Sequence, residues 1–257
     1  MPMPLPHAPD LRKSITVSIV SHGQLALILP LLAQLSRFSA ASIDKVVLTL
    51  NQPEPDLLAG QHWDFPVEQL ANVAPRGFGA NHNAAFQRCT TPWFLVLNPD
   101  MRFDCDVLAP LLALAAPRSA LLTPRILEPG KSEPEQHRAI ITPLEILRRK
   151  RSSYVRPSTP AWVPGLFMLL RAEAYAQLDG FDDKRFFMYG EDFDICARLR
   201  LAGWQLQVAE QLRARHEAQR ASHVSRQHLY WHLGSLLKVW TSRTFWRYRK
   251  LVTRQRV

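Results

Sequence analysis

Few cysteines and the lack of a long hydrophobic run exclude several classes of protein. Cys89, Cys105 and Cys196 are odd in number and far apart, which argues against a disulfide framework or a zinc site. Cysteines of this number and spacing are typical of proteins in a reducing compartment, where they serve as small buried residues. The longest apolar stretches, 25–35 and 107–116, are each interrupted by proline. Both are shorter than the roughly 18 to 20 residues that cross a bilayer.

Residues 1–13 are rich in proline and lack the apolar centre of a signal peptide. We therefore expect a flexible N-terminal segment 1–13 and a cytoplasmic protein. With 257 residues and 47% hydrophobic content, the chain can form one large domain with a real core, with or without an appendage.

Acidic residues are nearly absent from the end of the chain. Residues 211–257 hold eleven Lys or Arg and one acid, Glu217, so the whole net charge of +10 lies in this tail. The tail also carries large aromatic side chains at Trp231, Trp240, Phe245, Trp246 and Tyr248. This mixture suits an anionic membrane surface or a nucleic acid. A solvated helix whose aromatics pack on the body has the same composition. The membrane surface is the favoured partner; nucleic acid is not expected, because no nucleic-acid motif occurs.

What the chain does contain is an alternation of strand-like and helix-like segments. Apolar strands are predicted at 15–20, 45–50, 67–70, 93–97 and 120–123, with helices at 25–38, 81–88 and 107–115. Strands without polar alternation indicate an α/β fold with a mostly parallel central sheet and helices on both faces. Ligands of such sheets bind at the carboxyl ends of the strands. The turns at Ser21, Asn51 and Asn98 are expected at that edge.

The alternation is interrupted after residue 127. The stretch 128–160 is rich in proline, serine and charge and predicts a long excursion near this edge, with one short helix at 143–151. A strand at 162–171 follows, with Gly165 inside it, then a helix at 172–178 and a last strand at 205–209. Glycine within a strand marks a close approach of backbone or ligand, or else a simple bulge.

Three acidic residues, Glu191, Asp192 and Asp194, lie between an aromatic cluster and a predicted helix at 192–201 that Gly203 ends. Carboxylates beside apolar bulk are costly unless a metal, a cation or a reaction uses them. The start of a helix favours the ionised form, which can accept a proton from a substrate hydroxyl. The alternative is an acidic cap on a surface helix, and Asp194 with Arg198 can be a structural ion pair.

Seven short segments follow one another along the chain: 17–21, 77–83, 95–100, 163–165, 180–182, 187–194 and 198–204. They include, in order, the series Gly-Phe-Asp, Glu-Asp-x-Asp and Gly-Trp. In this order the segments resemble the family 2 glycosyltransferases with a GT-A, or Rossmann-like, fold. Among these the chain is most similar to bacterial dTDP-rhamnosyltransferases of cell-surface polysaccharide synthesis. The resemblance covers about 14–240, and this series is its specific part.

The resemblance implies a catalytic domain at 14–210, with a nucleotide-binding half at about 14–125 and an acceptor-side half at about 126–210. The basic aromatic tail, 211–257, would be a helical extension. The implied reaction is an inverting, metal-dependent transfer of a sugar from a nucleoside diphosphate to a hydroxyl. L-Rhamnose from dTDP-rhamnose is the expected donor group and a saccharide, expected to be lipid-linked, the acceptor. Such an enzyme would sit peripherally at the inner face of the plasma membrane.

The resemblance also implies roles for single residues. Asp192 would be the catalytic base, with Glu191 beside it to orient the acceptor or the helix. Asp100 would bind Mg²⁺ or Mn²⁺, although the family often has a second Asp where this chain has Asn98. His216 is either a second metal ligand or a solvated loop histidine, because its spacing to Ser222 is one residue longer than the family pattern. The nucleotide sugar would contact Ser21, His22, Gly23, Asn51, Arg76, Gly77, Gly79, Asn83, Asn98 and Gly165.

Departures from the family pattern put the base contacts in doubt. Arg76 and His82 are unusual at their positions, and Thr49 and Asn51 stand near the place of a common Asp. A GT-A domain that has lost turnover and only binds a nucleotide sugar or glycan is the main alternative. The presence of both Asp100 and Asp192 favours the enzyme.

Overall fold

The computed structural model describes residues 13–56, 58–135, 137–149, 151, 153–155, 157–217 and 226–254. Almost all of the segment predicted to be flexible, 1–13, lies outside the described residues, as do Ser222 and the side chain of His228. Within the described part, no helix is both long and apolar enough to cross a bilayer.

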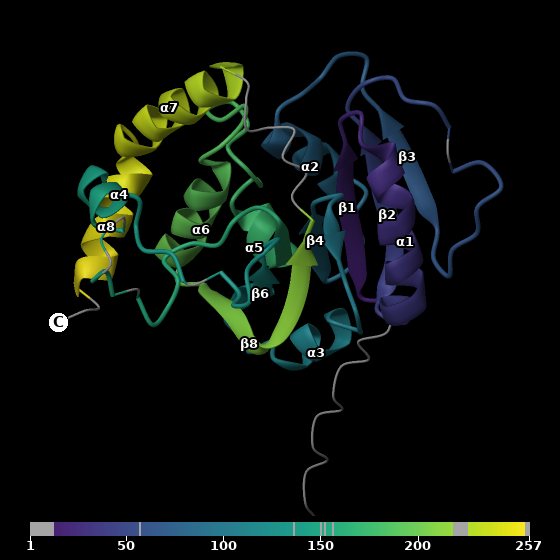
Figure 1. The fold of residues 1–257 in the computed structure, drawn as a ribbon, viewed down its shortest axis with the longest axis horizontal. Helices are drawn as coiled ribbons and strands as arrows, with labels where there is room; N and C mark the ends of the chain where they lie inside the picture. Colours follow the sequence, from purple (N-terminus) through teal and green to yellow (C-terminus); the bar gives the residue numbers. More distant parts are fainter. Residues whose placement is uncertain are drawn as a thin grey trace, which may run out of the picture.

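One sheet of eight strands runs through the described residues (Figure 1). Its order is β3-β2-β1-β4-β7-β6-β8-β5. The strands are β1 (Ile15–Ser21), β2 (Ile43–Leu50), β3 (Val67–Ala71), β4 (Trp93–Leu97), β5 (Met101–Arg102), β6 (Ser119–Leu127), β7 (Phe167–Arg171) and β8 (Gln205–His216).

The predicted α/β sheet is confirmed, and its two halves differ. Strands β3, β2, β1 and β4 pair in parallel, as expected for strands joined by helices. Beyond β4, strand β7 is antiparallel to both neighbours, β6 and β8 are parallel, and β5 is antiparallel to β8. The second half is therefore mixed.

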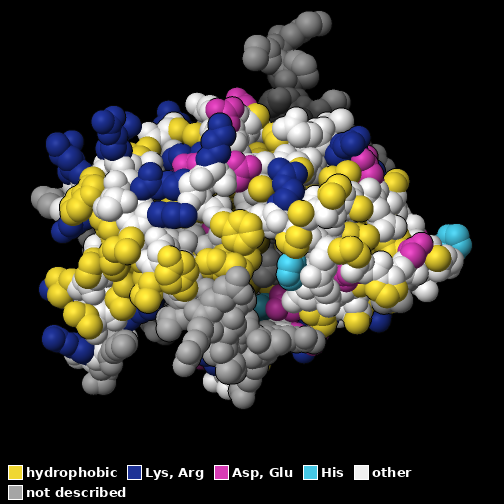
Figure 2. Space-filling model, turned by 90° about the horizontal axis from the view of Figure 1, so that it is seen from above, with side chains coloured by type: hydrophobic (Ala, Val, Ile, Leu, Met, Phe, Trp, Pro, Cys, Tyr) yellow, Lys and Arg dark blue, Asp and Glu magenta, His cyan; other side chains and the backbone are white. Residues whose placement is uncertain are grey.

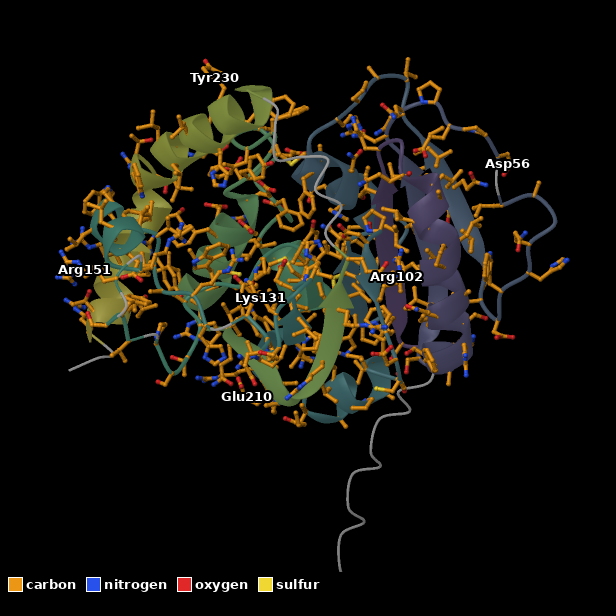
Figure 3. All side chains as sticks on the ribbon, viewed as in Figure 1. Asp56, Arg102, Lys131, Arg151, Glu210 and Tyr230 are labelled. Carbon is orange, nitrogen blue, oxygen red and sulfur yellow. The ribbon has the colours of Figure 1, made fainter. Side chains whose placement is uncertain are left out.

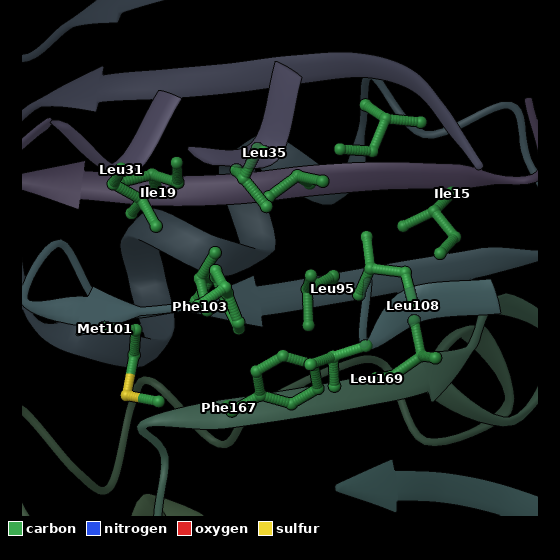
Figure 4. Close-up of a cluster of buried hydrophobic side chains, with 14 of the residues drawn as sticks. Ile15, Ile19, Leu31, Leu35, Leu95, Met101, Phe103, Leu108, Phe167 and Leu169 are labelled. Atoms are coloured by element: carbon green, nitrogen blue, oxygen red, sulfur yellow. The ribbon is translucent and has the colours of Figure 1, made fainter. Parts of the chain in front are cut away.

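Both faces of the sheet are covered because its strands alternate between two hydrophobic clusters. Ile15, Ile19 and Leu95 pack with α1 (Leu25–Ser39) and α3 (Leu108–Ala113) on one face, as Figure 4 shows. Phe94 and Val96 belong to the cluster on the other face. The helices of that face are α2 (Phe78–Phe86), α5 (Ala172–Gln177), α6 (Glu191–Leu201) and α8 (Arg243–Arg254).

The tail forms two helices, α7 (Arg226–Trp240) and α8, which lie with α4 (Pro143–Arg148) at the end of the molecule away from β1–β3 (Figure 1). Phe245 and Tyr248 of α8 are buried against α6 and its Phe193. The indole of Trp240 donates to Ile141 O at 2.7 Å. These aromatics pack on the body, whereas Trp246 remains 54% exposed.

Two strand predictions need correction. The strand expected at 162–171 begins only at Phe167, and Gly165 lies in the turn before it. The last strand does not end at residue 209: β8 continues to His216, because it pairs with β6 beyond a register shift and then with β5. Its later residues are mostly polar, so an apolar pattern does not reveal them. Of the cysteines, Cys196 is buried as expected, while Cys105 is exposed.

Candidate active site

The end of β8 brings His216 to Asp100. The chain leaves β4 at Leu97 and turns through Asn98, and Met101 of β5 then pairs with His216. Nε2 of His216 lies 3.0 Å from Oδ2 of Asp100, and Nδ1 lies 3.3 Å from Oε1 of Glu128. His216 is thus the last residue of a strand and mostly buried, and the alternative of a solvated loop histidine is wrong.

Burial and nearby charges act in opposite directions on the pKa of His216. Burial lowers the pKa of His216, but the hydrogen bonds and charges of Asp100 and Glu128 outweigh it and leave the pKa raised. The other oxygen of Asp100, Oδ1, is buried without a hydrogen-bond partner in the described part of the chain. A buried carboxylate oxygen left open in this way fits a cation that the protein does not itself supply.

The described residues do not form a complete metal centre by themselves. No group of three or more His, Cys, Asp or Glu among them is arranged to hold an ion. The residues that fit are one carboxylate and one imidazole, Asp100 and His216, with Glu128 on the far nitrogen of the ring. Oxygen atoms of a bound ligand would have to complete the coordination.

A second acidic site lies at the start of α6. Tyr189 and Gly190 both have left-handed backbone, with φ of 68° and 86°, and the helix begins at Glu191. Glycine adopts this conformation freely, but tyrosine does so at a cost of order 1 kcal/mol or more. The turn directs the Glu191 side chain into the protein, where Oε2 is buried with no partner in the described residues.

The carboxyls of Glu191 and Asp192 have different surroundings. Burial, followed by the charge of Asp192, raises the pKa of Glu191 to about 8. Burial also raises the pKa of Asp192, but the charge of Arg138 and backbone N–H donors of Phe193 and Gly165 oppose it. Phe193 N donates to Oδ1 of Asp192 at 2.8 Å. Backbone donors oppose the effect of burial on the pKa at both carboxyls, whereas the charge of Arg138 opposes it at Asp192.

Asp194 has a structural partner. Its Oδ2 accepts a 2.6 Å bond from Arg198, and Arg198 also donates to the carbonyls of Leu178 and Gly180. This ion pair ties α6 to the preceding turn, which confirms the structural alternative for Asp194.

One short turn lies between the two acidic sites. Asn98 N donates to Leu166 O at 2.9 Å, which attaches the turn that carries Asp100 to residue 166. At the neighbouring Gly165, an added Cβ would lie 3.8 Å from Cβ of Asp192 and 3.0 Å from Phe78. Asn98, two residues before Asp100, and Asp192 therefore both approach the same backbone turn. Gly165 lies in this turn and not within a strand, and the groups close to it are the side chains of Phe78 and Asp192.

Helix α7 supports the turn that precedes α6. The ring of Tyr189 stacks on His232, with centroids 4.6 Å apart. Ser235 donates to Met188 O at 2.7 Å, and a Cβ on Gly190 would lie 3.0 Å from Val239. The tail helix thus fixes the backbone from which Glu191 and Asp192 project.

At the turn after β1, where the sequence predicts nucleotide contacts, a residue that the sequence did not single out holds the turn together. Glu54 accepts bonds from Ser21 Oγ at 2.9 Å, Gly23 N at 3.1 Å and Leu25 N at 2.9 Å. Asn51 bonds the backbone of Arg76 in both directions, at 2.8 and 3.0 Å, and its amide also lies 3.2 Å from the ring of His22. Five of the predicted residues therefore meet here: Ser21, His22, Gly23, Asn51 and Arg76.

Three other predicted nucleotide contacts are engaged elsewhere. The Asn83 amide bonds Phe181 N and O at 2.9 Å and accepts from Tyr175, so it joins α2 to the turn at residue 181. A Cβ on Gly77 would lie 2.4 Å from Phe187 O, and one on Gly79 would lie 2.7 Å from Phe181. These contacts give the two glycines and Asn83 a role in packing, and their contact with a nucleotide sugar stays a prediction.

His82, unusual at its position, is a core residue. It is buried, Nδ1 lies 2.8 Å from Ser18 Oγ, and burial lowers its pKa to about 3. The ring therefore stays neutral and contributes packing against Phe78.

Sequence reasoning missed Glu54, Glu128 and Arg138. Glu54 and Glu128 each follow a strand that ends at the same edge, so their positions offered a weak signal. Arg138 belongs to the proline-rich excursion, and its guanidinium lies over the ring of Trp162 at 4.5 Å while bonding Glu135 at 2.8 Å. Nothing in the local sequence indicates that it approaches Asp192.

Comparison with known proteins decides the family. Residues 93–255 match the family model described as glycosyl transferase family group 2. The chain belongs to this family. That span covers β4, Asp100 in the turn after it, the whole of α6, and β8 with His216. Both acidic sites therefore lie within the matched residues.

Curated relatives in this glycosyltransferase family are about 30% identical. A pre-mycofactocin glycosyltransferase of Mycobacterium tuberculosis is 31% identical over 60% of this chain and 32% of its own length. An N-acetylglucosaminyl-diphospho-decaprenol L-rhamnosyltransferase of the same species is 32% identical over 44% and 42%. Rhamnosyltransferase WbbL of Escherichia coli is 29% identical over 55% and 61%. The chain thus spans between a third and three fifths of these relatives.

Solved structures confirm the GT-A fold. A structure of GalNAc-T7 with UDP, GalNAc and Mn²⁺ superposes with a TM-score of 0.64 at 17% identity, over 82% of this chain and 45% of that one. The mannosyltransferase PcManGT from Pyrobaculum calidifontis, with GDP-Man and Mn²⁺, gives 0.63 at 18% identity, over 92% and 68%. At these identities the likeness concerns the fold alone.

Proposed function

We propose that this chain is an inverting, divalent-metal-dependent glycosyltransferase that moves L-rhamnose from dTDP-rhamnose to a hydroxyl of a lipid-linked saccharide. One observation carries the proposal: the segment that leads from β4 to the Asp100–His216 contact and the Asp192 end of α6 both approach the turn at residues 165–166. The donor sugar and the lipid-linked acceptor follow the rhamnosyltransferase relatives, one of which is named for a diphospho-decaprenol substrate.

The residues divide the reaction into two tasks. Asp192 accepts the proton of the acceptor hydroxyl, whose oxygen forms a bond to the anomeric carbon while the bond from that carbon to the diphosphate breaks. The electron pair leaves with the diphosphate, and attack from the opposite face inverts the configuration. Glu191, with its pKa near 8, keeps its proton at neutral pH, so no second negative charge opposes that of Asp192.

Asp100 and His216 would hold the divalent cation, with Glu128 orienting the imidazole through its other nitrogen. A bound Mg²⁺ or Mn²⁺ would neutralise charge on the departing diphosphate. The turn at 163–166 fixes the spacing between this end of the site and Asp192, so that donor and acceptor are held in line.

The test is release of nucleoside diphosphate from a panel of nucleotide sugars, with Mn²⁺, Mg²⁺ or a chelator. We expect dTDP-rhamnose to be consumed only with the cation. Asp100→Asn and His216→Ala should raise the Mn²⁺ concentration required for half-maximal rate, and electron spin resonance should show weaker Mn²⁺ binding in the presence of dTDP. If the chain binds dTDP-rhamnose but consumes none with any acceptor, the inactive binding domain is the correct alternative.

The tail would hold the enzyme at the inner face of an anionic membrane. On α8, the basic residues Arg243, Arg247 and Lys250 are exposed, as is Trp246. Figure 2 shows hydrophobic and basic side chains together on the side of the molecule where α7 lies. Each engaged cation is worth about 1 kcal/mol near an anionic surface. Sedimentation with phosphatidylserine vesicles should therefore weaken as salt rises; undiminished binding at high salt would remove the electrostatic explanation.

A further inference from the structure

A cavity among the described residues lies apart from Asp100, where residues at the end of the 128–160 excursion meet α4, the end of α6 and α8. It has a volume of about 840 Å³, within the usual range for small-molecule sites. Arg148 and Arg151 line one side and Arg200 of α6 another, with Tyr248 of α8 between the helices. Figure 3 shows Arg151 at the end of the molecule that α4 and α8 form, far from Arg102 near β4.

The charges that line this cavity favour an anion. Its walls carry three arginines and one acid, Glu145, which already accepts the hydroxyl of Tyr154. Neither Arg148 nor Arg151 forms an ion pair with any described residue. Hydroxyl groups of Ser158 and Thr159 lie in the same wall. Guanidinium groups bind phosphate oxygens in bidentate fashion, so a phosphorylated ligand is the best match.

Asp192 does not line the cavity, but two chain segments connect the cavity wall to it. Ala139 and Ala161 line the cavity, and Ala161 N donates to the carbonyl of Arg138 at 2.8 Å. The guanidinium of this same Arg138 is the cation that acts on Asp192. Along α6, Arg200 follows Asp192 by eight residues, which at 1.5 Å per residue is about 12 Å. A saccharide attached to a group bound by Arg200 would have to cover about this distance to reach Asp192.

The outer end opens beside apolar surface. Leu144 and Leu147 of α4, which also carries Arg148, are 53% and 64% exposed, and Val155 is 87% exposed. An exposed apolar group of this kind next to a cationic cavity suits a ligand with a phosphorylated head and a hydrocarbon chain.

We propose that this cavity binds the diphosphate of a lipid-linked acceptor, with Arg148, Arg151 and Arg200 as its ligands. The inference rests on the proposed function and adds the acceptor subsite to it. The saccharide of such an acceptor would lie between the arginines and Asp192, while the lipid would leave the cavity across Leu144 and Leu147.

The experiment measures binding of farnesyl diphosphate, inorganic diphosphate and farnesol by calorimetry without divalent cations. We expect farnesyl diphosphate to bind more tightly than either other probe, because it alone has both groups. Arg148→Gln/Arg151→Gln should raise its Kd by about tenfold or more. The matched control is Arg118→Gln/Arg213→Gln, which removes two exposed charges outside the cavity and should leave the Kd unchanged. Melting temperatures verify that each variant folds.

Several outcomes would overturn the proposal. Equal affinity for inorganic and farnesyl diphosphate would indicate a site for free phosphate, and equal affinity for farnesol would indicate an apolar site. An equal loss in both double variants would indicate nonspecific charge. As a second measurement, farnesyl diphosphate should slow modification of Arg148 and Arg151 by phenylglyoxal; no protection contradicts the site. Donor turnover by the wild-type chain is measured separately, so failure of the proposed function and failure of this subsite are distinguishable.

Discussion

The polar groups at the ends of β1 and β2 differ from those around β4 and α6 in one respect. The side chains of Asn51 and Glu54 are bonded to backbone or side chains of the protein itself. Around β4 and α6, Asp100 Oδ1 and Glu191 Oε2 are buried with no described partner. Thr49, whose buried hydroxyl also lacks a described partner, is the exception in the first region. In the first region, apart from Thr49, the polar groups are satisfied by hydrogen bonds within the protein. The second region keeps buried polar atoms without a partner among the described residues, as functional sites do.

The sharpest test of this difference replaces the base. Asp192→Asn keeps the shape but cannot accept a proton, and transfer should fall by about 10²- to 10⁴-fold. Nucleoside diphosphate release and product formation measure this loss. The control is Asp64→Asn, which alters an exposed acid bonded to Ser36 outside the site and should leave the rate unchanged. A wild-type rate in Asp192→Asn would assign the base elsewhere.

The second test uses the pH dependence of stability. Glu191 has a pKa of about 8 in the fold against 4.5 for the ordinary group, so between these values only the folded chain holds the proton. Stability should therefore decline as pH rises from 4.5 to 8, by a few kcal/mol from this group. Glu191→Gln cannot ionise, so its melting temperature should exceed that of the wild type at pH 8, and the gap should close towards pH 5.

Glu173→Gln is the matched control for Glu191→Gln, because Glu173 also lies in the first turn of a helix but is exposed. Its melting curve should follow the wild type at every pH. If Glu191→Gln follows it too, Glu191 is not the buried acid that the structure describes.

The smallest expected effect is a loss of stability at Gly77, a closely packed glycine next to Arg76. Gly77→Ala would place a methyl group 2.4 Å from Phe187 O, a backbone atom that cannot easily move, and should cost about 1 to 3 kcal/mol. Gly234→Ala meets nothing within 4 Å inside α7 and should be neutral or slightly stabilising. Denaturant unfolding compares the two. Equal stability would show that residue 77 is free to adjust and so remains open to a ligand.

Local sequence patterns predicted the parallel half of the sheet well, because β1, β2 and β4 are buried apolar runs. They also placed the acidic pair at the start of α6. They could not predict that β8 continues to His216, because polar residues on an edge pairing have no apolar signature.

The same limit applies within the site. Asn83 and Gly77 carry family-like motif letters, but their partners, Phe181 and Phe187, lie about a hundred residues away in sequence. Arg138 is likewise brought to Asp192 only by tertiary packing of the excursion. The order of the motifs indicated the family and its two acidic sites. Which partner each polar residue bonds could not be predicted, because it depends on contacts between segments that are distant in sequence.

The stack of Tyr189 on His232, with the bond from Ser235 to Met188 O, has a mechanical consequence. The inner face of α7 rests on the strained backbone immediately before Glu191, while Leu233 and Leu237 on the same helix are exposed. A surface that contacts the outer side of α7 would be separated from Glu191 and the proposed base by one helix. Binding at that surface would then bear directly on how the carboxylate of the proposed base is oriented.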